Sequence, residues 1–143
     1  PLGDYRFGEN AYSYLDKMVE LCEKNGVELV LVKAPSLYPY WYDEWDEQME
    51  EYAEAHGLKY YNFLDDIEEI GLDFSVDTYD AGLHLNLSGA EKLSDYFGGI
   101  LRDACGLESR RGETALETAW EEKLAAYRAD IEAQYAALEQ TTE

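Results

Sequence analysis

The sequence predicts an α/β protein in which parallel strands alternate with helices, followed by one long C-terminal helix. Segments with the 3.6-residue apolar period of helices alternate, along residues 10–106, with two short segments rich in β-branched and aromatic residues. Such alternation is typical of parallel strands joined by right-handed crossovers. We therefore expect an α/β domain over residues 1–106, and a connector with a long amphipathic helix over residues 107–143.

The order of elements in the domain is expected to be helix, strand, helix, strand, loop and helix. Their expected ranges are 10–25, 27–32, 43–56, 59–64, 65–80 and 88–106. The first strand is nearly all apolar, which predicts cover on both faces of a parallel sheet. Ser88 and Glu91 form a capping-box pattern, which predicts that the last helix of the domain starts at Ser88.

The C-terminal region carries a single apolar stripe on a helix of ~39 Å, at 1.5 Å per residue. The stripe consists of Leu116, Trp120, Leu124, Tyr127, Ile131, Tyr135 and Leu138. We expect it to pack on the chain's own domain or on the hydrophobic face of a partner. Because the polar face is rich in Glu rather than in Lys and Arg, a helix lying on a membrane surface is not expected.

The charge of the chain disfavours two classes of partner. The formal net charge is -21, and both expected regions are acidic. Such a surface repels phosphate backbones and anionic lipid headgroups, so neither nucleic acid nor direct membrane binding is expected. No apolar run approaches the ~18 residues of a membrane span. A neutral or cationic substrate is favoured instead.

Neither the cysteines nor the acidic residues predict a cofactor. Cys22 and Cys105 are far apart and have no CxxC or Cys/His spacing, so we expect two buried free thiols rather than a disulfide or a reactive thiol. Asp73, Asp77 and Asp80 lack the one-three-five spacing with a central Gly of an EF-hand calcium loop. We expect no metal and no cofactor.

The most informative stretch runs from Asp77 to Ala90. Asp80 lies shortly before His84 in a Gly-containing loop, and Asn86 and the expected helix start follow. Histidine is the side chain whose unperturbed pKa lies near neutrality, and a neighbouring carboxylate fixes its tautomer and stabilises its charged form. The pattern is typical of a catalytic base, and a structural histidine is the alternative.

This stretch resembles the last conserved block of SGNH/GDSL-type hydrolases, in which an Asp and a His lie close together before the final helix. The matching residues are Asp80, His84-Leu85-Asn86 and Gly89-Ala90. The strand ends at Lys33-Ala34-Pro35 and at Asn62-Phe63-Leu64-Asp65 are also similar to that family. The resemblance covers about residues 5–106. Within the family, the chain looks most like bacterial envelope-associated SGNH-like proteins, which are related to those that modify acyl groups of cell-wall polymers or exopolysaccharides. It implies the C-terminal part of a three-layer, flavodoxin-like domain.

The resemblance also implies a serine-dependent ester hydrolase or acyl transferase, acting on acylated carbohydrate or another small ester, in a parent protein of the bacterial envelope or another extracytoplasmic place. His84 would be the general base that deprotonates a serine hydroxyl, and Asp80 would orient it. The family usually places two residues between acid and histidine, but three lie between Asp80 and His84, which leaves Asp77 as a rival acid. Gly82 would let the loop absorb the extra residue.

The chain contains no Gly-Asp-Ser block and no Gly and Asn blocks that would supply oxyanion donors. Ser36 follows the end of an apolar strand, where α/β folds place functional residues, but it lacks a Gly-flanked turn and Pro35 constrains the approach. Ser88 is better explained as a helix cap. The opening Pro1-Leu2-Gly3 resembles a protease-cleavage scar or the middle of a longer protein. Because the Gly-Asp-Ser, Gly and Asn blocks are missing, we expect the chain to supply only the Asp–His part of a site. It should then be inactive alone, hydrolysing p-nitrophenyl acetate no faster than a His84→Ala variant.

An aromatic loop between Tyr38 and Trp45 supplies the remaining candidate site residues. Trp41, Tyr42 and Trp45 would form a sugar-stacking wall, and the alternative is aromatic packing between the second helix and the sheet. Asn86 is a further candidate, either supporting His84 or stabilising its turn.

A second hypothesis is a non-catalytic module in which this aromatic loop binds glycan or the C-terminal helix binds a partner. Because two strands make a thin sheet, we also expect self-association or an N-terminal segment supplied by another chain.

Overall fold

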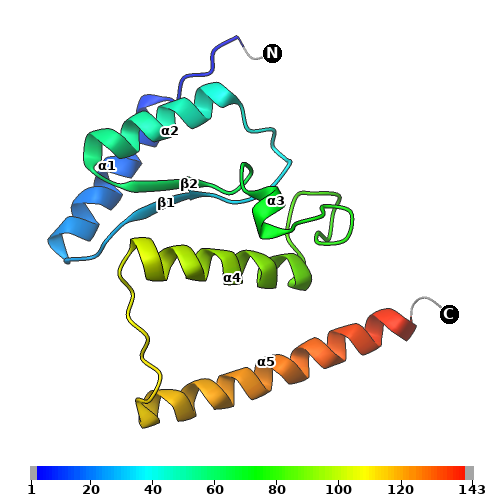
Figure 1. Ribbon diagram of the computed structural model, residues 1–143. Coiled ribbons are helices and arrows are strands. Elements are labelled where there is room, and N and C mark those ends of the chain that lie inside the picture. Colours follow the sequence, from blue (N-terminus) through cyan, green and yellow to red (C-terminus); the bar gives the residue numbers. More distant parts are fainter. Residues whose placement is uncertain (1–2, 141–143) are drawn as a thin grey trace. The chain divides into compact units, whose positions relative to one another are not determined.

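The structure is a computed structural model that describes residues 3–140, except for some side chains near the end of the last helix. Its elements are α1 (Glu9–Lys24), β1 (Val30–Lys33), α2 (Asp43–His56), β2 (Lys59–Asn62), α3 (Ile67–Ile70), α4 (Leu87–Ala104) and α5 (Thr114–Gln140) (Figure 1). The chain divides into two compact units, residues 1–99 and 100–143.

The two strands form a parallel sheet, which confirms the predicted α/β class. β1 and β2 pair in register from Val30 with Lys59 to Lys33 with Asn62. The described residues contain no further strand beside them, so the sheet has two strands and the three-layer flavodoxin-like domain is not formed. The alternation of patterns predicted which segments are neighbours, but it did not determine how many strands the sheet has.

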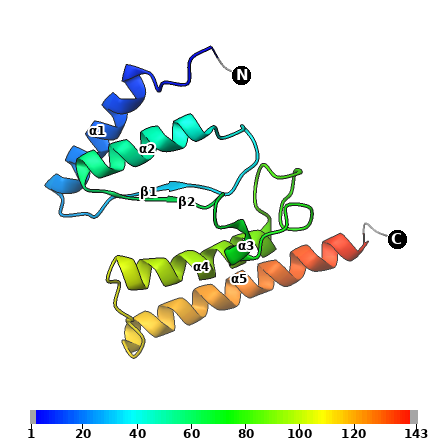
Figure 2. The same cartoon turned by 45° about the horizontal axis from the view of Figure 1, so that its top comes forward.

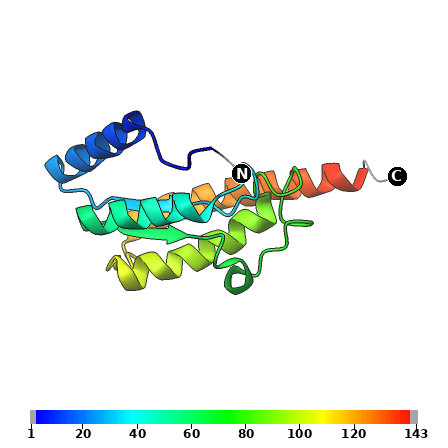
Figure 3. The same ribbon diagram turned by 90° about the horizontal axis from the view of Figure 1, so that it is seen from above.

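One face of the sheet is covered by α1 and α2, which lie on the same side of it (Figures 1 and 2). Val19 of α1, Leu31 of β1, and Tyr52 and Ala53 of α2 form the buried core there. The helix α2 lies along β2 (Figure 3). Burying a large apolar side chain contributes about 1.5–3 kcal/mol, so this small cluster is the main stabilising contact of that face.

The opposite face is covered by α4, which lies on the other side of the strands (Figure 1). Phe63, which directly follows β2, is 1% exposed. Its ring lies 5.1 Å from that of Phe97 and 6.1 Å from that of Tyr96, both on α4. These ring contacts attach the middle of α4 to the end of β2.

Three local expectations need correction. The first strand begins at Val30 rather than at residue 27, because pairing with β2 starts only there. The acidic stretch expected to be loop contains the short helix α3, which ends at Gly71 with a φ of 73°. Cys22 and Cys105 are free, as expected, but half-buried rather than buried.

The predicted C-terminal helix is present as α5, a helix of 27 residues. In its apolar stripe Trp120, Leu124 and Tyr127 are 61%, 42% and 44% exposed. The side chains of Tyr135 and Leu138 lie outside the described residues. What packs on this stripe therefore stays a prediction.

Within the described residues, no helix combines the length and apolar character needed to cross a membrane.

Candidate functional site

The loop that carries Asp80 and His84 is closed at its base by backbone hydrogen bonds. Thr78 and Leu85 form an isolated antiparallel bridge. The Tyr79 N–H donates to the His84 carbonyl oxygen at 3.0 Å, and the Asn86 N–H donates to the Asp77 carbonyl oxygen at 2.9 Å. The residues between Tyr79 and His84 therefore form the tip of a small hairpin.

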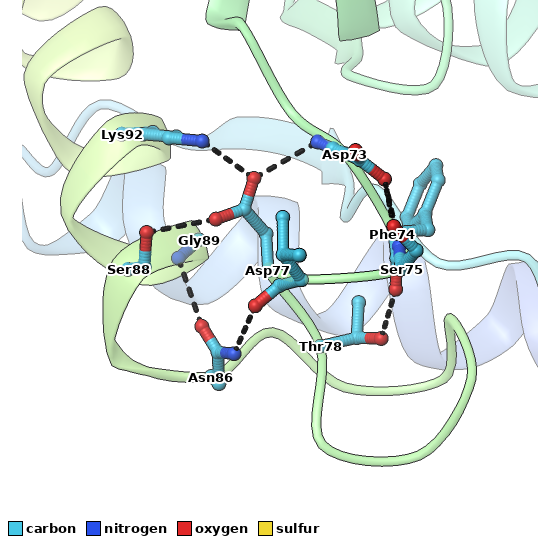
Figure 4. Close-up of polar contacts among 10 residues, drawn as sticks. Asp73, Phe74, Ser75, Asp77, Thr78, Asn86, Ser88, Gly89 and Lys92 are labelled. Carbon is cyan, nitrogen blue, oxygen red and sulfur yellow. Dashed lines mark hydrogen bonds and ion pairs between the residues drawn. The ribbon is translucent and has the colours of Figure 1, made fainter.

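Asp77 anchors this hairpin to α4, as Figure 4 shows. Its side chain is 1% exposed, and both carboxylate oxygens are occupied. Oδ2 accepts from the Asp73 N–H at 2.8 Å and from Lys92 Nζ at 2.6 Å, and Oδ1 accepts from the Ser88 hydroxyl at 2.8 Å. Asp77 is thus the acceptor that joins the loop to the first turns of α4.

The pKa of Asp77 reflects two opposing effects. Burial by itself raises the pKa, because it disfavours the charged form. The hydrogen bonds from the Asp73 N–H, Lys92 and Ser88 favour the carboxylate, and together they hold the pKa below its ordinary value. Asp77 is therefore ionised at neutral pH, with its charge balanced inside the fold.

The start of α4 is capped by Asn86 rather than by Ser88, which corrects the predicted capping box. Asn86 Oδ1 accepts from the Gly89 N–H at 3.2 Å, and its Nδ2 donates to the Val76 carbonyl oxygen at 2.7 Å (Figure 4). The Ser88 hydroxyl is directed to Asp77 instead. Both polar atoms of Asn86, a predicted substrate-binding residue, thus bond within the loop and helix start.

Gly89 allows α4 to approach the loop closely. A Cβ at Gly89 would collide with the carbonyl oxygen of Asp77 and lie 3.0 Å from the side chain of Leu85. Any larger residue there would push α4 away from the base of the hairpin. The close packing of this loop on α4 therefore requires glycine at position 89.

The tip of the hairpin is folded by Thr78 and two residues of positive φ. Thr78 Oγ1 donates to the Phe74 carbonyl oxygen at 2.6 Å and accepts from the Gly82 N–H at 2.9 Å. Ala81 and Gly82 have φ of 56° and 102°. These left-handed residues turn the chain back, so that three intervening residues still bring His84 next to Asp80.

Asp80 and His84 form a bidentate pair at this tip. His84 Nδ1 lies 2.7 Å from Asp80 Oδ2, and the His84 backbone N–H donates to Asp80 Oδ1 at 2.7 Å. The His84 side chain is 70% exposed, and its Nε2 has no hydrogen-bond partner among the described residues. Hydrogen bonds from the His84 side chain and backbone lower the pKa of Asp80, which favours its charged form.

The geometry separates the two rival acids. Asp80 contacts the imidazole, whereas both oxygens of Asp77 are occupied by Asp73, Ser88 and Lys92. Asp77 holds the base of the hairpin on α4 and makes no hydrogen bond to His84. In this structure, Asp80 is therefore the acid that orients His84.

The hairpin tip is attached to the loop that follows β1. The Leu37 N–H donates to the Gly82 carbonyl oxygen at 2.7 Å, and a Cβ on Gly82 would collide with the Leu37 side chain. Leu37 also lines a cavity of about 260 Å³ at the carboxyl ends of both strands. The lining residues are Ser36, Leu37, Tyr40, Trp41, Asp43, Asp46, Asn62, Leu64 and Asp65. The Asp80–His84 loop is thus tied to the rim of an acidic and aromatic cavity.

The three aromatic candidates lie together but have different surroundings. The Trp41 ring lies 5.5 Å from the Trp45 ring, and Tyr42 lies 4.9 Å from Trp45. Of these three candidates, only Trp41 lines the cavity. Trp45 stacks on Phe7 at 6.1 Å and Tyr42 packs on Tyr5 at 5.0 Å. Trp45 and Tyr42 thus pack on the N-terminal segment. Trp41 instead contacts both α2 and the end of β1: its Nε1 donates to Asp46 Oδ1 at 3.0 Å, and Lys33 Nζ lies 5.5 Å from the centre of its ring.

Sequence reasoning missed Lys33 as a residue of this region. Its Nζ lies 3.1 Å from Ser36 Oγ and 5.5 Å from the centre of the Trp41 ring. The signal available in the sequence was a lysine three residues before a serine at the end of a strand. No group of three or more His, Cys, Asp or Glu side chains in the described part of the chain is arranged to hold a metal ion.

The fold and the site together define an α/β chain with a solvent-exposed Asp–His pair on the hairpin before a helix. No known protein family, curated protein or solved structure matches the chain.

Proposed function

We propose that the chain supplies the Asp–His part of an SGNH-type site, in a serine-dependent ester hydrolase or acyl transferase. His84 is the general base for a serine hydroxyl contributed from outside residues 1–143, and Asp80 holds its ring. Through Nε2 the imidazole accepts the hydroxyl proton and then returns it to the leaving alcohol.

The observation that supports this proposal is the geometry of the Asp80–His84 pair. A carboxylate on Nδ1 at 2.7 Å favours the tautomer with the proton on Nδ1, which leaves the Nε2 lone pair free to act as a base. The second oxygen of Asp80 holds the His84 backbone at 2.7 Å, so acid and ring are fixed as one unit. A structural histidine would use both ring nitrogens inside the fold, whereas this ring is 70% exposed.

The surroundings of the pair favour a small neutral or cationic ester, such as an acylated carbohydrate. Asp43, Asp46 and Asp65 line the neighbouring cavity and repel an anionic substrate. Trp41 offers an aromatic surface in the same cavity, which suits the apolar face of a sugar ring. From the resemblance to envelope-associated SGNH-like proteins, we further propose that the parent protein belongs to the bacterial envelope.

The finer fold that we propose is part of a flavodoxin-like, three-layer domain. Within the described residues β1 pairs with a strand on one side only. Two strands are marginal as a sheet, so a further strand from another chain or segment would be stabilising. We propose that the open edge of β1 receives it, together with the segment that contributes the serine.

The direct test is ester hydrolysis by the purified chain. An exposed imidazole hydrolyses p-nitrophenyl acetate slowly by itself, so the rate measured with an equal concentration of 4-methylimidazole is subtracted from that of the wild-type chain. We expect the corrected rate to equal the rate of His84→Ala. His56→Ala is the matched control for loss of a histidine outside the hairpin. A clear His84-dependent turnover by the chain alone would show that no outside serine is needed and would contradict the proposal.

A second candidate function is a glycan-binding module, favoured by the position of Trp41 in the cavity wall. Titration with neutral oligosaccharides, followed by tryptophan fluorescence, separates the two aromatic positions. Binding should be lost in Trp41→Ala and retained in Trp45→Phe, because Trp45 packs on Phe7 and does not line the cavity. Equal affinity in Trp41→Ala would remove this candidate.

A further inference from the structure

The carboxyl end of β1 brings a lysine and a serine together at the same cavity. Lys33 is the last residue of β1, and the chain then turns at Pro35, where the Ser36 N–H donates to the Ala34 carbonyl oxygen at 2.9 Å. This turn places Ser36 Oγ 3.1 Å from Lys33 Nζ. Ser36 is half-buried and lines the cavity of about 260 Å³. The Pro-containing turn thus presents Ser36 without the Gly-flanked turn that the sequence lacks.

The surroundings of Lys33 are suited to a base rather than to a surface cation. Burial lowers its pKa, and the nearby carboxylate of Asp46 on α2 partly opposes that effect. Asp43 and Asp65 are two further carboxylates in the same cavity wall. Lys33 Nζ donates to the Ala34 carbonyl oxygen at 2.5 Å, which fixes the amine beside Ser36.

An amide donor lies at the same edge of the sheet. Asn62 ends β2 and is the register partner of Lys33, so the two side chains leave the sheet on the same face. Asn62 lines the cavity and donates one Nδ2 hydrogen to Asp65 Oδ2 at 3.1 Å. Its second hydrogen has no acceptor among the described residues, and an amide N–H is a donor of the kind that stabilises an oxyanion.

We propose that Ser36 is a second nucleophilic centre, activated by Lys33 as general base, which accepts an acyl group from a small ester bound in this cavity. Neutral Lys33 takes the proton of the Ser36 hydroxyl as Oγ attacks the ester carbonyl carbon. The bond to the leaving alcohol breaks, and the Lys33 ammonium returns the proton to that oxygen. Water, deprotonated by Lys33, then attacks the carbonyl carbon of the acyl-Ser36 ester. The bond to Ser36 Oγ breaks, the Lys33 ammonium returns the proton to that oxygen, and the carboxylic acid is released. Serine with lysine as its base is a known alternative to Ser–His–Asp.

This centre is independent of the Asp80–His84 proposal, because all of its groups lie between β1, β2 and their loops. It goes beyond that proposal by giving the chain a nucleophile of its own. Failure of one proposal leaves the other untouched, since His84 variants report on the first and Ser36 and Lys33 variants report on the second.

The test is covalent labelling by a short-chain alkyl fluorophosphonate, which reacts with activated serine. The Ser36 oxygen bonds to phosphorus, fluoride leaves, and the proton goes to Lys33. We expect one adduct per chain by intact mass spectrometry, located at Ser36 by peptide fragmentation. Ser36→Ala should abolish it, and Ser13→Ala, an exposed serine on α1, should leave it unchanged.

Lysine variants separate activation from simple exposure of the hydroxyl. Lys33→Arg retains a hydrogen-bond donor beside Ser36 but stays protonated and cannot act as a base, so labelling should slow by about a hundredfold. Labelling of Lys33→Met should slow by a similar factor. His56→Ala, at the C-terminal end of α2, should label at the wild-type rate. No adduct at Ser36, or a labelling rate that Lys33→Arg leaves unchanged while circular dichroism shows native helix content, would overturn the proposal.

Discussion

Asp77 and Asp80 belong to the same hairpin, yet the structure gives them opposite environments. Asp77 is 1% exposed and takes three hydrogen bonds from the residues around α4. Asp80 is 41% exposed and has His84 as its partner, through both the ring and the backbone. One carboxylate fixes the base of the hairpin to the domain, and the other fixes the imidazole at its tip.

Within one short loop, one carboxylate thus holds the fold together and the other holds an exposed imidazole. A buried carboxylate with several donors has a large energetic effect on folding, because its removal leaves those donors unpaired. An exposed pair contributes little to stability, since water and salt screen it. Variants of the two aspartates should therefore affect different measurements.

The largest expected effect is the loss of Asp77. Asp77→Ala removes the acceptor of Lys92, Ser88 and the Asp73 N–H, and should lower the free energy of unfolding by about 3 kcal/mol. Asp80→Ala should leave the free energy of unfolding nearly unchanged. Urea denaturation followed by circular dichroism measures both. Equal destabilisation by the two variants would contradict the division of roles.

The next effect concerns the close approach of α4 to the hairpin. Gly89→Ala places a methyl group against the carbonyl oxygen of Asp77, and should destabilise by about 2 kcal/mol through overpacking.

Gly98→Ala is the control on the same helix, because no atom lies within 4 Å of a Cβ built there. It should stabilise by about 0.5–1 kcal/mol, as expected for replacing glycine inside an exposed helix. If Gly89→Ala behaves like Gly98→Ala, the close approach is absent in solution.

A smaller effect should appear in acid. The pKa of Asp77 in the fold lies below its value of about 3.9 in the unfolded chain, so its contribution is fully present above pH 4 and is lost as the pH falls through the folded pKa. Denaturation curves between pH 5 and pH 2 should show a steeper loss of stability for the wild type than for Asp77→Asn. Parallel loss in both chains would show that Asp77 is not the group responsible.

Much of the fold follows from local patterns in the sequence. The range of α2 was predicted to the residue, because a helical apolar period runs up to Gly57, whose φ of 64° ends the helix. α3 was missed because four residues are too few to show a period. The Asn86 cap was missed because Ser88 and Glu91 offered a capping box, although Asn caps helices as well as Ser does.

The candidate site was predictable in part. The spacing of Asp80 and His84 indicated a pair, but sequence alone kept Asp77 as a rival. Asp77 is excluded from the pair by partners that lie 11 and 15 residues further along the chain, on α4. The Lys33–Ser36 contact depends on how the chain turns after β1, which residue types alone do not determine.

The most direct test of the Asp80–His84 pair is the tautomer of His84, measured by long-range ¹H–¹⁵N NMR above the pH at which the ring is charged. We expect Nδ1 to carry the proton and Nε2 to show the chemical shift of a free lone pair. Asp80→Ala should shift the ring toward the Nε2-protonated form that free histidine prefers. A wild-type ring already in that form, and unchanged by Asp80→Ala, would contradict the account.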